Sequence, residues 1–280
     1  ANLLKDYHDY TTSIRNYALP LTGKEERVAY IKTNINKLEN WKNRFKGVLD
    51  KESDRAVNKE INAFITKFKE LLEMQNEKPF PVKVPRVADS SIIIDGRLND
   101  QGWQKAEKLS GFYKIGGGKA QHQTEFRIVY DRNNLYLGIT AFEPEIKKLN
   151  VRYKKHDSEV FKDDSIEIFL DLNQDRESYD HIVVNSAGVV YDSFNIISFD
   201  GGHYTNKGWN CHCRVATSKG KNAWIVEIAI PFKYLGEAKI TKGERWNFTI
   251  ARERWIEPKE FTSYSGVFND PNQFWTLEFD

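Results

Sequence analysis

The stretch Phe126-Arg-Ile-Val-Tyr-Asp-Arg-Asn-Asn-Leu-Tyr-Leu-Gly-Ile-Thr-Ala-Phe142 decides the fold of most of this chain. In its two arms, 126–130 and 135–142, apolar side chains recur with the two-residue period of a β-strand. The polar segment Asp131-Arg-Asn-Asn134 between them has the composition of a turn. The stretch therefore predicts a β-hairpin.

Stretches further along the chain repeat this two-residue period and are separated by turn sequences such as Ser186-Ala-Gly188. The expected strands are 165–170, 181–185, 189–194, 210–217, 223–230, 246–254 and 276–279. Many short strands joined by turns are typical of an antiparallel sandwich or barrel. The sequence therefore predicts an all-β domain over residues 86–280.

Residues 1–78 differ in composition, because they contain Pro20 as their one proline and only two glycines. Apolar residues recur there at three- and four-residue steps over 24–50 and 52–75, with a weaker stripe before Pro20. This spacing predicts three helices, the last two long and antiparallel. Three prolines within 79–85 predict a stiff, extended connector. We therefore expect a helical module at 1–78, a connector at 79–85 and the β domain after it.

Composition excludes several classes of protein and partner. The 280 residues carry 42 basic and 40 acidic side chains, and a balance of +2 makes neither nucleic acid nor an anionic membrane an expected partner. Mean hydropathy is −0.64 and apolar runs are short, so no membrane insertion is expected. Nothing at the start reads as a signal peptide. Two cysteines exclude a disulfide framework and a four-thiolate metal site.

Six stretches of the β domain follow one another in the order of the motifs of a known family. They are Ile94-Asp-Gly-Arg-Leu-Asn-Asp-Gln-Gly-Trp103, Ile128-Val-Tyr-Asp131 with Leu135-Tyr-Leu137, Asp164-Ser-Ile-Glu-Ile-Phe-Leu-Asp171, Asn185-Ser-Ala-Gly188, Trp224-Ile-Val-Glu-Ile-Ala-Ile-Pro231 and Phe268-Asn-Asp-Pro-Asn-Gln-Phe-Trp-Thr-Leu277. The third is the most specific. Together they resemble the family 9 carbohydrate-binding modules from about residue 86 to 280. The helical segment lies outside the resemblance.

The resemblance implies an immunoglobulin-like or DOMON-like antiparallel β-sandwich for residues 86–280. With the helices predicted at 1–78, the expected fold class of the whole chain is α+β. It also implies a non-catalytic saccharide-binding module of a larger, secreted bacterial protein that degrades polysaccharides. The expected partners are an oligo- or polysaccharide and a hydrolase domain of the same polypeptide. The expected location is extracellular, periplasmic or on the cell surface.

The resemblance also implies a set of sugar-binding residues. In the family, two tryptophans hold the apolar face of a sugar ring, and polar side chains contact its hydroxyl groups. These tryptophan positions fall on Phe161 and Phe268, and the motif glutamate falls on Glu167. Two further polar positions of the family fall near Val183 and Ala251, which are apolar here. We add Asn269 and Arg252 as candidate polar contacts.

Each of these positions has a structural alternative. Phe161 and Phe268 could instead fold back onto the sandwich, although their neighbours in sequence are polar. Glu167 alternates with isoleucines in an otherwise apolar strand, so its carboxylate needs a partner. That partner could be an arginine on a neighbouring strand, Arg252 or Arg254, in a purely structural ion pair.

A calcium site is expected in one loop, and no other cofactor is required. Asp171, Asn173 and Asp175 place oxygen atoms at alternate positions, as calcium prefers, and the resembling family contains structural calcium. The alternative is a solvated turn capped by these side chains. Cys211-His-Cys213 has ligands that zinc could use, but no zinc site is expected there. On a strand the two thiols would face one side and the imidazole the other, so one ion could not contact all three.

Three rival functions remain. The first is a structural accessory domain with a vestigial sugar site that packs against a glycoside hydrolase domain. The second is haem binding, as in electron-transfer relatives of this sandwich, but the one methionine is Met74 of the helical segment. The third is an enzyme, for which no nucleophile elbow or other catalytic constellation is found. Acidic residues such as Asp163 and Glu167 could be named as the two carboxyl groups of a glycoside hydrolase, but we assign no catalytic residue.

Overall fold

The structure is a computed structural model that describes residues 2–15, 19, 23–198, 202–236 and 239–280. It divides into two compact units, residues 1–80 and 81–280. Each unit is described by itself. No described helix is both long enough and apolar enough to cross a membrane.

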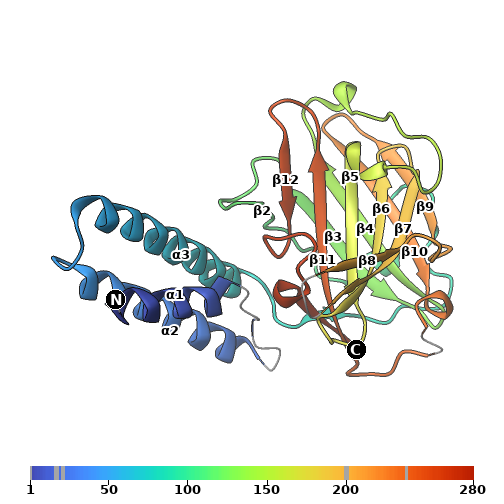
Figure 1. The fold of residues 1–280 in the computed structure, drawn as a ribbon. Helices are drawn as coiled ribbons and strands as arrows, with labels where there is room; N and C mark the ends of the chain where they lie inside the picture. The colour runs from blue at the N-terminus through green and yellow to red at the C-terminus, as the bar shows by residue number, and fades with distance from the viewer. Residues whose placement is uncertain (1, 16–18, 20–22, 199–201, 237–238) are drawn as a thin grey trace. The chain divides into compact units, whose positions relative to one another are not determined.

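The first unit consists of the helices α1 (Asn2–Arg15), α2 (Lys24–Phe45) and α3 (Lys51–Glu77), as the sequence predicts. Figure 1 shows α2 and α3 side by side in opposite directions. Tyr7 of α1 packs its ring 5.6 Å from Trp41 and 5.2 Å from Phe45 of α2. The expected end of α2 at residue 50 is wrong, because Gly47 adopts a left-handed conformation (φ 75°) and stops the helix. Pro20 lies outside the described residues.

Asp50 begins α3, because its carboxylate accepts the backbone N–H groups of Glu52 and Ser53. The apolar stripe of α3 is buried, with Ile61 and Phe68 fully inaccessible to solvent. Met74, also on this stripe, is 3% exposed, so its thioether is part of the helical core.

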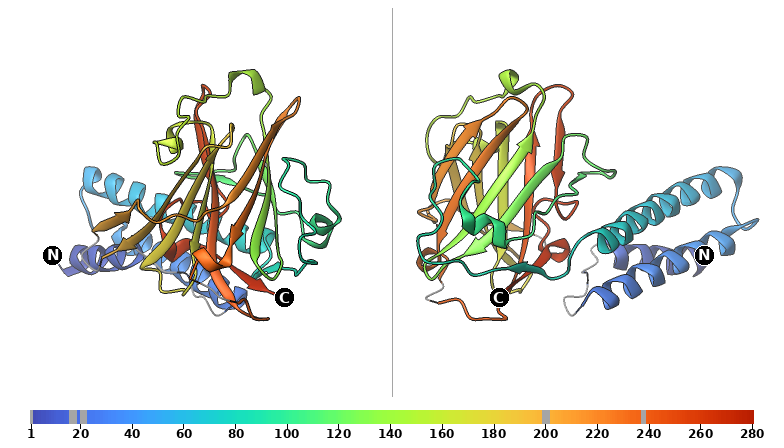
Figure 2. Two further views of the ribbon diagram at one scale, coloured as in Figure 1. Left: turned by 90° about the vertical axis from the view of Figure 1, so that its right-hand side faces the viewer. Right: turned by 180° about the vertical axis from the view of Figure 1, so that it is seen from behind.

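The second unit is a sandwich of two sheets, and Figure 2 shows them as two layers. The larger sheet has the order β1-β13-β11-β5-β6-β7-β8, with β12 beside β11 and β2 beside β12. Its strands are β1 (Val82–Val84), β2 (Tyr113–Lys114), β5 (Ser165–Asp171), β6 (Ser178–Asn185), β7 (Val190–Ile197), β8 (His203–Asn206), β11 (Arg245–Arg254), β12 (Glu260–Ser263) and β13 (Trp275–Phe279). The smaller sheet has the order β3-β4-β10-β9, with β3 (Thr124–Tyr130), β4 (Asn134–Phe142), β9 (Arg214–Lys219) and β10 (Ala223–Pro231).

The core of the sandwich lies between the two sheets. Phe126 of β3 contacts Phe248 of β11 with ring centres 6.1 Å apart, so these side chains mark the inner faces. Phe248 lies opposite Leu170 of β5 in the larger sheet, and Ile168 shares the face of Leu170. Even-numbered residues of β5 therefore face the core, and Glu167 and Phe169 face the outside of the larger sheet.

The predicted hairpin is the β3–β4 pair, which is antiparallel with Tyr130 opposite Leu135. The predicted antiparallel sandwich is confirmed, and its expected strands correspond to β3 to β7, β9 to β11 and β13. The strands β1, β2, β8 and β12 were not predicted. They have two to four residues each, too few for a two-residue period to stand out.

Two local predictions differ from the structure. Val82–Val84 of the expected connector pairs in parallel with β13, so this segment belongs to the sandwich. The strand expected at 210–217 begins only at Arg214, because His212 adopts a left-handed conformation (φ 47°) that no strand contains. Cys211 and Cys213 consequently lie in a loop, where the Cys213 N–H donates to the Cys211 sulfur at 3.3 Å.

Candidate functional site

Glu167 lies at the centre of the outer face of the larger sheet. Its neighbours across the strands are Ala251 on β11 and Val183 on β6. These are the two apolar residues at positions where the resembling family carries polar side chains. Glu167 is only 3% exposed, so its carboxylate depends on polar partners from the side chains around it.

A chain of hydrogen bonds supplies those partners. The Nε2 atom of His181 lies 2.6 Å from the carboxylate of Glu167. On the other side, Glu253 shares a hydrogen bond with Glu167. The indole N–H of Trp255 donates to Glu253 at 2.7 Å and to the carbonyl of Phe161 at 3.1 Å. The chain therefore connects the centre of the face to the turn that carries Phe161.

The carboxyl group of Glu253 holds its proton more strongly than an ordinary glutamate does. Burial, and then the negative charge of Glu167, raise the pKa of Glu253 well above the usual range of a glutamate. Glu253 is therefore protonated at neutral pH and can donate the hydrogen bond that it shares with Glu167.

Aromatic rings form a row across the same face. The ring of Phe161 lies 5.7 Å from that of Tyr191, which lies 5.9 Å from the ring of His181. His181 stacks on Phe169 at 4.3 Å with an angle of 9° between the planes, and Phe169 lies 6.4 Å from Phe268. The row therefore ends in Phe161 on one side and in Phe268 on the other, with the Glu167 network between them.

The predicted sugar-binding residues Phe161, Glu167 and Phe268 thus lie on one face, although Phe161 and Phe268 are 107 positions apart in the sequence. Phe161 and Phe268 are half-buried, and each packs against buried apolar side chains of the same face, Phe161 against Val183 and Tyr191 and Phe268 against Phe169 and Phe274. Asn269 follows Phe268 and is exposed.

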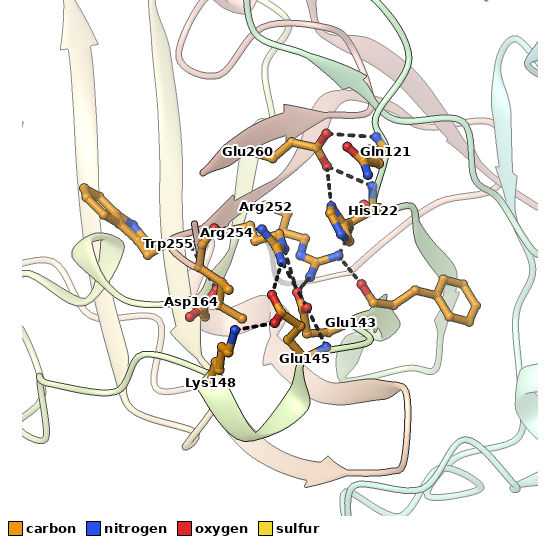
Figure 3. Close-up of polar contacts among 12 residues, drawn as sticks. Gln121, His122, Glu143, Glu145, Lys148, Asp164, Arg252, Arg254, Trp255 and Glu260 are labelled. Carbon is orange, nitrogen blue, oxygen red and sulfur yellow. Dashed lines mark hydrogen bonds and ion pairs between the residues drawn. The ribbon is translucent and has the colours of Figure 1, made fainter. Parts of the chain in front are cut away.

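Arg252 does not belong to this face. It alternates with Glu253 on β11, so it points into the sandwich and is 1% exposed. There its guanidinium contacts Glu143 at 3.1 Å and the carbonyl of Phe142 at 2.8 Å, and Arg254 binds the same Glu143 at 2.7 Å (Figure 3). The prediction that Arg252 contacts sugar is therefore wrong, and so is the alternative that either arginine pairs with Glu167.

The expected calcium ligands form a capped turn between β5 and β6. The carboxylate of Asp175 accepts the backbone N–H groups of Glu177 and Ser178, each at 2.8 Å, and the side-chain amide of Asn173 at 2.7 Å. Asp171 is fully buried, and its Oδ2 atom accepts from Asn247 at 3.0 Å. Its Oδ1 atom has no hydrogen-bond partner, so one of the three side chains has an oxygen left for a cation.

Sequence reasoning missed His181, Glu253, Trp255 and Tyr191. A signal for two of them was present, because His181 and Glu253 stand two residues from Val183 and Ala251 and so share their face of the sheet. Which residues meet across the strands is decided by register, and that is visible only in the folded sheet.

Comparison with known proteins agrees with this architecture. A curated relative, exoglucanase XynX of Acetivibrio thermocellus, is 28% identical over 152 residues, which are 54% of this chain and 12% of the relative. Endo-1,4-beta-xylanase A of Thermoanaerobacterium saccharolyticum is 29% identical over 140 residues, 50% of this chain and 11% of the relative. The chain thus matches only about a tenth of the length of these relatives.

Among solved structures, a putative carbohydrate-binding protein of Bacteroides uniformis has the same fold. Its TM-score is 0.57 at 16% identity, and the match covers 72% of this chain and all of that one. Residues 94–278 match the family described as carbohydrate family 9 binding domain-like, an interval that includes the sandwich from before η1 (Gln101–Lys105) to β13. The chain therefore belongs to the carbohydrate family 9 binding domain-like proteins, as the six sequence motifs predict.

Proposed function

We propose that the outer face of the larger sheet binds a saccharide without chemical reaction. The observation that carries this proposal is the position of two half-buried rings, Phe161 and Phe268, on either side of the Glu167 network. The C–H face of a sugar ring packs on aromatic rings, and its hydroxyl groups pair with carboxylate and imidazole groups. The membership of the chain in a carbohydrate-binding family supports the same function.

The test is calorimetric titration with soluble xylo- and cello-oligosaccharides. Phe161→Ala and Phe268→Ala should each weaken binding by about 1–2 kcal/mol, the worth of one aromatic contact, or roughly 5- to 30-fold in Kd. Phe142→Ala is the matched control, because Phe142 is a partly exposed phenylalanine, 38% accessible, on the smaller sheet. Loss of affinity in the control variant, or unchanged affinity in both test variants, would place the sugar elsewhere.

A second candidate is a structural accessory domain with a vestigial site. Two observations favour it. The residues directly opposite Glu167, Val183 and Ala251, are apolar, and the carboxylate of Glu167 already has His181 and Glu253 as partners. A fully satisfied carboxylate gains little from a sugar hydroxyl. Absence of any hit on an array of plant and bacterial glycans would favour this candidate.

We also propose that the chain acts within a longer, secreted polysaccharide-degrading protein. The support is that its curated relatives are an exoglucanase and a xylanase, of which the matched segments are 12% and 11%. A weak saccharide site linked to a hydrolase raises the local concentration of substrate, so modest affinity suffices. Fusion to a xylanase catalytic domain should increase activity on insoluble xylan but not on soluble xylo-oligosaccharides.

A further inference from the structure

A histidine and two aspartates meet at the edge of the larger sheet, on the opposite side of β7 from the aromatic row. They are His156, Asp157 and Asp192, and one ligand atom from each lies within 4.8 Å of the other two. Tyr191 faces the proposed sugar site, and Asp192, the next residue, faces the opposite way. The cluster is therefore separate from the saccharide face.

Asp192 is the buried member of the cluster. Its side chain is fully inaccessible to solvent, and its Oδ2 atom accepts the backbone N–H of Cys211 at 2.8 Å. Its Oδ1 atom has no hydrogen-bond partner. A buried carboxylate oxygen without a partner destabilises the folded state unless a cation or a hydrogen-bond donor satisfies it.

His156 and Asp157 reach the cluster from an exposed loop. The Asp157 N–H donates to the carbonyl of Val190 at 3.1 Å, which attaches the loop to the edge of β7. The Nδ1 atom of His156 lies 2.9 Å from the carboxylate of Asp157. Two members of the cluster are therefore exposed, and the third, Asp192, is buried.

An ion pair between His156 and Asp157 alone would explain their contact but not the unpartnered Asp192 oxygen. A divalent ion bound to all three explains both. One imidazole nitrogen and two carboxylate oxygens suit zinc, cobalt or manganese, whereas calcium and magnesium prefer oxygen ligands only. The Cys211 N–H would hold Asp192 in place as an outer-shell contact.

We propose that His156, Asp157 and Asp192 form a binding site for a divalent transition-metal ion, with water completing its coordination. The test is titration of the metal-free protein with Zn²⁺ by calorimetry and with Co²⁺ by visible absorption. One equivalent should bind, and Co²⁺ should give d–d bands without the near-ultraviolet band of a thiolate ligand.

Three variants define the site. His156→Ala removes an exposed ligand without touching the core and should weaken Zn²⁺ binding at least tenfold. Asp192→Asn keeps the shape of the buried side chain and should do the same, with circular dichroism confirming its fold. His203→Ala is the matched control, because His203 is an exposed histidine on β8 of the same sheet, and its affinity should not change.

Three results would overturn the proposal. They are no Zn²⁺ binding up to millimolar concentration, binding that is unchanged in His156→Ala, and a cobalt–thiolate band that identifies Cys211 or Cys213 as the ligand. Because the saccharide site lies on the other face, sugar affinity should be the same with and without metal. The two proposals can therefore fail separately.

Discussion

At the scale of single residues, the buried charges of the sandwich are divided between two roles. Glu167 and Glu253 lie on the outer face, hydrogen-bonded to each other, between the half-buried rings of Phe161 and Phe268. Arg252, Arg254 and Glu143 lie inside, where each charge has a partner (Figure 3). On β11, Glu253 faces outward and its neighbours Arg252 and Arg254 face inward, because successive side chains of a strand point to opposite faces of the sheet.

The inner ion network predicts a large loss of stability when its shared carboxylate is neutralised. Glu143 is fully buried, and Glu143→Gln removes the carboxylate charge that the guanidinium groups of Arg252 and Arg254 share. Removing one partner of a buried ion pair costs about 3–5 kcal/mol. Urea denaturation should report a decrease of this size in the free energy of unfolding.

The control is Glu145→Gln, because Glu145 is partly exposed and lies 3.8 Å from Arg254. An ion pair with one partner open to solvent contributes about 0–1 kcal/mol to the free energy of unfolding. Equal losses in the two variants would show that the network does not depend on its buried charge.

At the scale of elements, the β5–β6 turn is where the calcium prediction can be tested. The turn is closed by Asp175, and Asp171 keeps one buried oxygen without a partner. An ion bound only by the folded state stabilises it according to RT ln(1 + [L]/Kd). Chelation should therefore lower the melting temperature, and Asp171→Asn should remove that difference.

The turn itself provides the comparison. Asp175→Ala should lower the melting temperature even with chelator present, because it removes the acceptor of two backbone N–H groups. If chelator leaves the melting temperature of the unmutated protein unchanged, the turn is held by these hydrogen bonds alone.

At the scale of the whole molecule, buried carboxyl groups predict that stability decreases from mildly acidic to alkaline pH. Asp180 is 4% exposed, and burial followed by the negative charge of Asp192 raises its pKa to about 8. The unfolded chain releases this proton near its ordinary value of 3.8, so between these pH values the folded state binds more protons. The free energy of unfolding therefore falls as pH rises through this window.

The measurement is the melting temperature of the metal-free protein at pH 5, 6, 7 and 8, because a cation on Asp192 would offset the charge that raises the pKa of Asp180. Asp180→Asn should flatten the decrease, because its amide has no proton to lose in this range. Asp89→Asn, a substitution at an exposed carboxyl, should leave the slope as it is. A slope that is equally steep in Asp180→Asn would exclude Asp180 as its source.

The sequence by itself determined the elements and the family. A two-residue apolar period, as in 126–142, indicates a strand that is buried on one face. A period of three to four residues indicates a helix that is buried on one face. Both periods depend only on residues that are close together in the sequence, so they can be recognised before the fold is known. The six motifs identified the family, and the match over residues 94–278 now shows it.

Only the tertiary structure decided which side chains meet. Register across β5, β6 and β11 brought His181 and Glu253 to Glu167, and it turned Arg252 inward to Glu143. The left-handed residue His212 ended a predicted strand early. Contacts between residues far apart in the sequence depend on the pairing of whole strands, and a shift by one position exchanges the two faces of a sheet. The apolar period of a single strand does not determine its register with neighbouring strands.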